Sequence, residues 1–230
     1  MEWNKEVVLT YKNLDLAVGS GVLDLERGRM DEKTDFPWLT DDSFAWNAWS
    51  WNVNMEMKTP DIVVDELVDI VSKNGCLLLN IAPTSDGLIP EEMRNGLLEI
   101  GKWLSVNGEA IYDTRPFVTY GEGVTILGKN HFGGVQGRGI SYMPEDFRFT
   151  ENGDFLYIIQ LGVPEPGKEY LLKSFVNGGI AAKYKVKKIE VLGSSEKIKF
   201  DQTNDGLRIA APKVAPNDKA VVYKAKITKS

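Results

Sequence analysis

The chain has 230 residues, of which 43% are hydrophobic and 26% are charged, so it can bury a core and is not disordered throughout. Its formal net charge of −6 leaves no basic stripe for phosphates, so we expect no nucleic-acid partner. The single cysteine, Cys76, excludes an internal disulfide and a cysteine-based zinc site. The single histidine, His131, excludes a histidine-cluster metal site, and we expect no metal and no cofactor.

The N-terminal residues MEWNKEVVLT have neither the apolar run nor the basic flank of a signal peptide. No apolar stretch approaches the roughly 20 residues of a membrane span. We therefore expect no membrane association.

Residues 6–13, EVVLTYKN, predict a strand because β-branched and aromatic residues form an apolar run. A polar, glycine-containing stretch follows that is too long for an idle turn in a compact domain. Residues 37–54, PWLTDDSFAWNAWSWNVN, then hold four of the six tryptophans, namely Trp38, Trp46, Trp49 and Trp51.

Residues 59–75 predict a helix with signals at both ends. Thr59 can cap it, Pro60 suits its first turn, and Asn74-Gly75 supplies a left-handed exit. The apolar positions between them fall on one broad face.

Residues 76–83, CLLLNIAP, are typical of a parallel strand covered on both faces, and residues 90–108 predict a second helix. Helix, strand, loop and helix in this order indicate an α/β barrel or a doubly wound sheet. In both architectures the loops at the carboxyl ends of strands face the ligand, so we expect residues 80–87 beside a site.

The second half of the chain changes character after TRPF, near residues 112–118. From Val118 onward, about eight short alternating runs are separated by turn residues, and no helical pattern appears. This spacing predicts an antiparallel β-sandwich. We place the domain boundary between residues 1–115 and 116–230.

These segments together resemble one enzyme family. ELVDIVSKNGCLLLNIAPTSDGLIPEE, followed by LLEIGKWLSVNGEAIYDTRPF, resembles the end of the catalytic barrel in α-L-fucosidases of glycoside hydrolase family 29. LDLERGRMDE and FPWLTDDSFAWNAWSW resemble the preceding barrel loops, and DFRFTENGDFLYIIQL and KKIEVLG are similar to the family's C-terminal β-sandwich. The resemblance covers nearly the whole chain. It implies a partial (β/α) barrel over residues 1–115 and an antiparallel β-sandwich over residues 116–230.

The resemblance implies retaining hydrolysis of α-L-fucosyl linkages in fucosylated glycans, carried out by two carboxyl groups. In the family, the nucleophilic Asp lies in a Trp-Phe-Asp-like motif on a strand before the one that EVVLTYKN resembles. That motif is absent from this sequence, so we expect the chain alone to be inactive. An N-terminal barrel segment would supply the nucleophile, and a homo-oligomer is an alternative assembly. Family members are often periplasmic, secreted or lysosomal, so the compartment stays open.

Four positions match the family's site. Glu26 in DLERGR is the candidate general acid/base, and Leu39 occupies the position where another family sub-pattern has a Glu. Lys12 falls where relatives often carry an Arg that contacts the nucleophile or the sugar. Trp49 in WSWN matches an aromatic position that lines the fucose pocket, and Trp38 is a second candidate for that contact.

Structural roles compete with these assignments. Glu26 could be a loop carboxylate paired with Arg27 or Arg29. Trp46 and Trp51 are interpreted as core residues, Cys76 as a small buried residue, and Asp41 and Asp42 as helix or loop caps. An alternative function is a non-catalytic carbohydrate-binding or accessory protein in which the sandwich is the working part.

Overall fold

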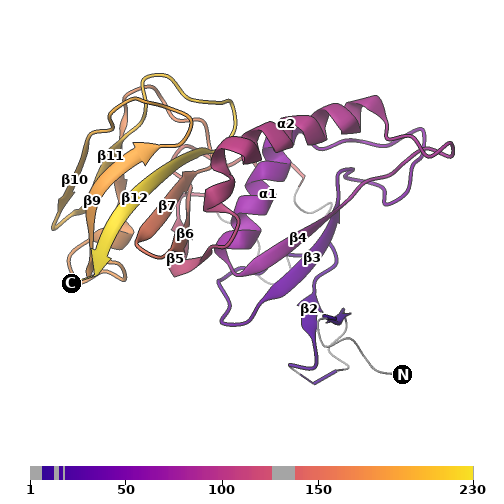
Figure 1. Ribbon diagram of the computed structural model, residues 1–230, viewed down its shortest axis with the longest axis horizontal. Coiled ribbons are helices and arrows are strands. Elements are labelled where there is room, and N and C mark those ends of the chain that lie inside the picture. The colour runs from indigo at the N-terminus through magenta and orange to yellow at the C-terminus, as the bar shows by residue number, and fades with distance from the viewer. Residues whose placement is uncertain (1–6, 13–15, 18, 126–137, 230) are drawn as a thin grey trace.

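The computed structural model describes residues 7–12, 16–17, 19–125 and 138–229. The predicted strand at residues 6–13 lies partly outside these ranges, and His131 lies wholly outside them. In the described chain a parallel sheet, interrupted by one helix and followed by a second, precedes two antiparallel sheets (Figure 1). The elements of the first half are β1 (Thr10–Tyr11), β2 (Val22–Asp24), β3 (Trp38–Ser43), α1 (Pro60–Ser72), β4 (Gly75–Asn80) and α2 (Glu91–Asn107).

The parallel sheet has the strand order β1-β2-β3-β4, so its strands lie in sequence order. One crossover, from β3 to β4, passes through α1, which matches a β/α repeat. The described strands form an open sheet and not a closed barrel. The barrel therefore stays a prediction at this point.

Strand β4 lies at the edge of this sheet in the described chain, and one of its faces is exposed, which corrects the expectation of a strand covered on both faces. One face of the strand packs toward the helices through Leu77, Leu79 and the following Ile81. The opposite face carries Cys76 and Leu78, and 58% of Leu78 is exposed. The prediction that Cys76 is buried is wrong, because no described element covers that face of β4.

Both predicted helices are present, with slightly shorter bounds. Thr59 occupies the N-cap position of α1 in an extended conformation, but its side chain makes no capping hydrogen bond. Asn74 has a φ of 75°, which confirms the left-handed exit. Neither helix of the described chain is long and apolar enough to cross a membrane.

The second half forms an antiparallel β-sandwich. Its larger sheet has the order β5-β6-β7-β12-β9, its smaller sheet has the order β10-β11-β8, and aromatic residues such as Phe117, Phe149 and Phe175 fill the space between them. The first strand already begins at Arg115, although the alternating pattern was expected only from Val118. The strands are β5 (Arg115–Glu122), β6 (Phe147–Asn152), β7 (Phe155–Gln160), β8 (Glu169–Leu172), β9 (Tyr184–Val191), β10 (Phe200–Thr203), β11 (Gly206–Ala210) and β12 (Val221–Lys229).

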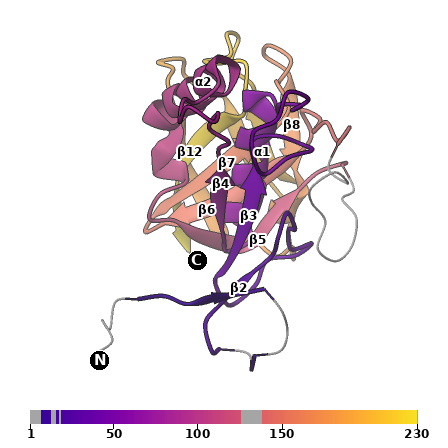
Figure 2. The same ribbon diagram turned by 90° about the vertical axis from the view of Figure 1, so that its right-hand side faces the viewer.

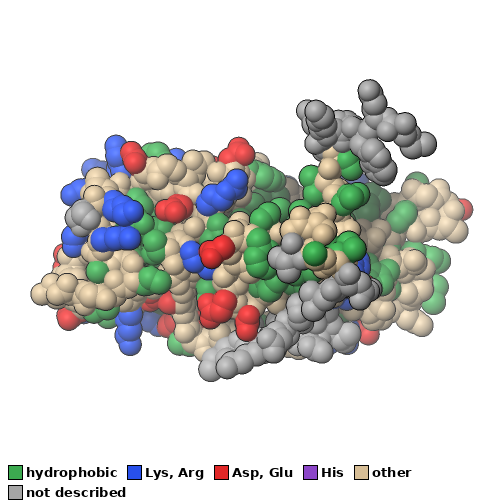
Figure 3. Space-filling model, turned by 90° about the horizontal axis from the view of Figure 1, so that it is seen from below, with side chains coloured by type: hydrophobic (Ala, Val, Ile, Leu, Met, Phe, Trp, Pro, Cys, Tyr) green, Lys and Arg blue, Asp and Glu red, His purple; other side chains and the backbone are tan. Residues whose placement is uncertain are grey.

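The larger sheet is buried on both faces along β7. Leu156 and Ile158 point into the sandwich core, whereas Tyr157 and Ile159 pack against the helices. The helices α1 and α2 therefore pack on the sandwich, and α1 lies between it and the parallel sheet (Figure 1). In the end-on view of Figure 2 these layers overlap. Viewed from below, Lys and Arg side chains gather over the sandwich, at the left of Figure 3.

A buried ion network joins the two halves. The Asp69 carboxylate, on α1, is fully buried and accepts hydrogen bonds from Arg148 Nε on β6 at 2.6 Å and from Lys73 Nζ at 2.9 Å. Arg29, from the loop after β2, lies 3.9 Å from the same carboxylate. Burial alone would raise the pKa of Asp69, but these three cations outweigh it and hold the pKa below its usual range.

Candidate functional site

The candidate site lies on the face of the parallel sheet that no described helix covers, near the carboxyl ends of the strands. The register pairs Tyr11 with Leu23 and Asp24 with Leu39, so Lys12 follows β1 beside Asp24. Because side chains alternate along a strand, Asp41 points to the same face as Leu39. Three neighbouring strands thus bring polar groups to one place.

Lys12 is the centre of this cluster. Its Nζ lies 2.8 Å from Asp41 Oδ2, 3.3 Å from Glu26 Oε2 and 4.0 Å from Asp24 Oδ2. Partial burial lowers the pKa of Lys12, but the hydrogen bonds that it donates to Asp41 and Glu26 outweigh it, and the net pKa is raised. One ammonium group therefore faces three carboxyl groups.

The cluster brings together two of the predicted site residues, Lys12 and Glu26. Glu26 pairs with Lys12 and with neither Arg27 nor Arg29, so the alternative pairing is wrong. The Glu26 side chain is 55% exposed. Its carboxylate is thus open to a ligand while it is held on one side by the ammonium group.

Arg27 connects Glu26 to the predicted aromatic residue Trp49. Its guanidinium carbon lies 4.3 Å from the centroid of the half-buried Trp49 ring, at cation–π distance. The same group donates hydrogen bonds to Trp46 O at 2.8 Å and to Ala48 O at 3.1 Å. Arg27 also has a φ of 51°, a conformation that few non-glycine residues adopt. The arginine therefore fixes the loop of Trp49 beside the backbone of Glu26.

Asn80 supports the same loop from β4. Its Nδ2 donates hydrogen bonds to Trp49 O at 2.8 Å and to Ser43 Oγ at 3.3 Å. The start of the predicted 80–87 segment thus contacts the loop that carries Trp49.

Asp24 is a member of the cluster that the sequence analysis missed. The residue is buried, and its Oδ1 has no hydrogen-bond partner in the described chain. Burial, and then the negative charge of Asp41, raise the pKa of Asp24, while Lys12 opposes them. The signal was present in DLE, since Asp24 and Glu26 are two residues apart and point to the same face when β2 continues.

Trp38 lies on the opposite face of the sheet. Its side chain is fully buried, and its Nε1 donates a hydrogen bond to Lys73 O at 3.0 Å. A Cβ atom at Gly75 would come within 2.5 Å of the indole, so the ring is packed directly on the β4 backbone. Trp38 therefore has no ring face open to a sugar, and the predicted contact is not available in this structure.

Of the other predictions for the tryptophan-rich segment, one is confirmed and the rest are wrong. Trp46 is buried as expected, whereas Trp51 is 41% exposed and is not a core residue. Asp41 and Asp42 lie on β3, and neither caps a helix. Asp42 instead accepts from the fully buried Lys58 at 2.7 Å.

Lys58 anchors the segment behind the site. Its Nζ also lies 2.8 Å from Glu66 Oε2 on α1 and 4.8 Å from the centroid of the Trp46 ring. Burial raises the pKa of Glu66, and the charge of Lys58 opposes that shift. In the described residues no group of three or more His, Cys, Asp or Glu side chains could hold a metal ion.

Comparisons with known proteins point to alpha-L-fucosidases. The family model described as alpha-L-fucosidase matches residues 4–109. Tissue alpha-L-fucosidase from Homo sapiens is 32% identical over 177 residues, which cover 74% of this chain and 32% of the human protein. The Bos taurus protein of the same name is 29% identical over 187 residues, covering 79% of this chain and 34% of the bovine protein.

Solved structures show the same fold. Alpha-L-fucosidase isoenzyme 1 from Paenibacillus thiaminolyticus superposes with a TM-score of 0.66 at 24% identity, covering 90% of this chain and 45% of that protein. The Thermotoga maritima alpha-fucosidase, solved in complex with fucose, gives a TM-score of 0.66 at 23% identity, covering 89% of this chain and 44% of that protein.

These matches define the class as glycoside hydrolases of the fucosidase type. The chain belongs to the α-L-fucosidase family, glycoside hydrolase family 29, and corresponds to its C-terminal region. It spans about a third of the length of the curated relatives that it matches.

Proposed function

We propose that this chain forms the C-terminal portion of a retaining α-L-fucosidase that acts on fucosylated glycans. Residues 1–115 supply the last strands of a (β/α) barrel, and residues 116–230 supply the supporting β-sandwich. The ion pair of Lys12 and Glu26 at 3.3 Å, just after two neighbouring parallel strands, carries the proposal. Family membership supports the substrate class.

Glu26 is the proposed general acid/base, because its exposed carboxyl group can reach the oxygen of a leaving group. Lys12 neutralises part of the negative charge around it and presents an ammonium group to the sugar or to the nucleophile. Trp49 offers an aromatic face to the apolar side of fucose, and Arg27 holds that ring from the other side.

The attacking Asp belongs, in this proposal, to polypeptide that the present sequence does not contain. We therefore expect the purified chain to leave 4-nitrophenyl α-L-fucoside intact. If the chain does turn over the substrate and Glu26→Gln abolishes that turnover, the role of Glu26 stands but the claim that the chain lacks its nucleophile is refuted. Turnover that persists in Glu26→Gln would overturn both.

A chimera tests the function itself. The part of human tissue alpha-L-fucosidase that precedes its matched stretch would be joined to this chain, which restores a complete barrel in our proposal. We expect retaining hydrolysis of the aryl fucoside, followed by NMR of the first-formed anomer. Glu26→Gln should lower kcat by roughly 10²–10⁴-fold.

Glu190→Gln is the matched control, since Glu190 is an exposed glutamate that also pairs with a lysine, Lys188, but lies on β9. Equal activity of the Glu26 and Glu190 variants in a folded chimera would refute the assignment of Glu26.

A further inference from the structure

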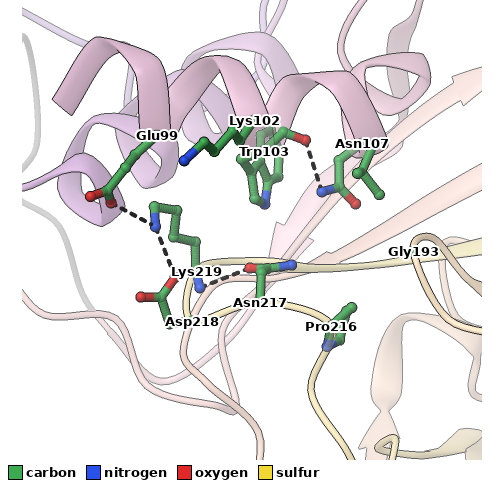
Figure 4. Close-up of a pocket in the computed structure, with 10 residues that line it drawn as sticks. Glu99, Lys102, Trp103, Asn107, Gly193, Pro216, Asn217, Asp218 and Lys219 are labelled. Atoms are coloured by element: carbon green, nitrogen blue, oxygen red, sulfur yellow. Dashed lines mark hydrogen bonds and ion pairs between the residues drawn. The ribbon is translucent and has the colours of Figure 1, made fainter. Parts of the chain in front are cut away.

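A cavity lies between α2 and the sandwich, away from the carboxyl ends of the parallel strands. Its volume is about 430 Å³, within the range of small-molecule sites. The C-terminal half of α2 forms one wall, and the loop before β12 together with Gly193 forms the other (Figure 4). We call it the junction cavity; its lining includes Lys102, Trp103, Asn107, Asn217, Asp218 and Lys219.

Two amide side chains leave hydrogen-bonding capacity unused at this cavity. Asn107 is 1% exposed and donates through Nδ2 to Trp103 O at 3.0 Å, but its Oδ1 has no donor in the described chain. Asn217 accepts at Oδ1 from Lys219 N at 2.8 Å, and its Nδ2 makes no hydrogen bond within the described residues. The walls therefore hold one unpaired acceptor, Asn107 Oδ1, which is buried, and one unpaired donor, Asn217 Nδ2.

The charges around the cavity balance. Lys219 Nζ is paired with Asp218 at 2.8 Å and with Glu99 at 3.3 Å, so it is not free to hold an anion. Lys102 supplies a further ammonium group with no ion pair among the described residues. Two acidic and two basic side chains thus line the site, which favours a neutral ligand over a phosphate or a polycation.

The apolar part of the lining suits the C–H face of a ring. Val106 on α2 is 46% exposed, and Pro216 lies on the opposite wall. Trp103, another residue of the lining, is held in place by the hydrogen bond from its Nε1 to Ala220 O at 2.9 Å. A ligand that combines C–H surface with hydroxyl groups matches both kinds of lining, because each hydroxyl can donate and accept.

We propose that the junction cavity binds one neutral sugar residue and serves as a glycan-contact site separate from the site of Glu26. A ring hydroxyl would donate to Asn107 Oδ1, and a second would accept from Asn217 Nδ2 or Lys102 Nζ. Small side-chain movement is needed, since Asn107 Oδ1 is itself shielded from solvent. The role of this site would be to hold a glycan on the sandwich side of the protein.

NMR of the full ¹⁵N-labelled chain tests the proposal. Methyl α-L-fucoside, methyl β-D-galactoside, N-acetylglucosamine and inorganic phosphate would be titrated separately. We expect at least one sugar to shift the Trp103 indole and Asn217 side-chain amide signals, with a Kd on the order of 1 mM. Asn217→Ala should weaken that binding about tenfold, as loss of one hydrogen bond predicts.

Two further variants separate this proposal from the proposed function. Glu26→Gln and Trp49→Ala should leave the shifts at the junction cavity unchanged. Shifts confined to Trp49, shifts produced by phosphate alone, or no shift with any sugar would each overturn the junction site. A normal spectrum of Asn217→Ala, whose residue lies in a surface loop, would show that its effect is not unfolding.

Discussion

Replacement of Asp69 by Asn should destabilise the whole protein severely. The substitution keeps the shape of the side chain but removes the charge that faces Arg148, Lys73 and, at 3.9 Å, Arg29. Two unit charges about 4 Å apart attract by roughly 4 kcal/mol at an effective dielectric constant of about 20. Breaking a buried pair from one side costs about 3–5 kcal/mol because the remaining charge stays buried. We expect a loss in that range, out of a total of about 5–15 kcal/mol for a typical protein.

Equilibrium unfolding in urea, followed by tryptophan fluorescence, measures this loss. Asp218→Asn is the control: Asp218 also forms an ion pair, at 2.8 Å, but its side chain is 85% exposed. Its effect should stay within about 0.5 kcal/mol. A loss below about 1 kcal/mol for Asp69→Asn would refute the view that this carboxylate holds the two halves together.

The pH dependence of the free energy of unfolding is a second test of the role of Asp69. The folded state lowers the pKa of Asp69, so its stabilisation is complete above the unfolded pKa of about 3.9 and is lost as pH falls below it. The wild-type chain should therefore lose stability as pH falls below about 4. Asp69→Asn should flatten that acid limb, and an unchanged slope would contradict the assignment.

Three other substitutions probe the surroundings of the site. Asp24→Asn should raise the free energy of unfolding at pH 7 by roughly 1 kcal/mol, because folding raises the pKa of Asp24 and ionisation of that group therefore destabilises the wild-type protein. In thermal unfolding the gain should vanish near pH 3.5, where the wild-type carboxyl group is protonated. Lys58→Met should cost about 3–5 kcal/mol in urea unfolding, since two buried carboxylates lose their cation; a neutral result would argue against the pairs at 2.7 and 2.8 Å. Arg27→Lys should shift the emission of Trp49 and lower stability by about 1–2 kcal/mol, because a lysine cannot replace the forked donor; unchanged emission would refute its support of the ring.

Local sequence patterns predicted the helices and strands well where caps or alternation of apolar residues mark the element. The helix at α1 was signalled by Pro60 and by the left-handed Asn74, and the sandwich strands by their alternation. The first sandwich strand was placed too late, because Arg115 and Pro116 look like a linker by composition yet pair with β6. Such pairing depends on distant residues that a local window does not contain.

The site was harder to predict because it depends on register. Lys12 and Glu26 were named from a family resemblance, but their ion pair requires β1 and β2 to align as neighbours. Trp38 was misplaced for the same reason: the face of β3 on which it lies cannot be read from a tryptophan-rich segment. The contact of Arg27 with Trp49 carries no sequence signal, and the burial of Asp24 adds to the weak signal of its two-residue spacing from Glu26.

The sheet that contains β7 and β12 has a practical consequence for dissecting the molecule. One face of this sheet packs into the sandwich core through Val221 and Tyr223, whereas the other face packs against the helices through Val222. A polypeptide cut at the predicted boundary would uncover the helix-facing side as an apolar surface. We expect such an excised piece to self-associate, so that attempts to assign an activity to either half are best made by point substitution in the intact chain.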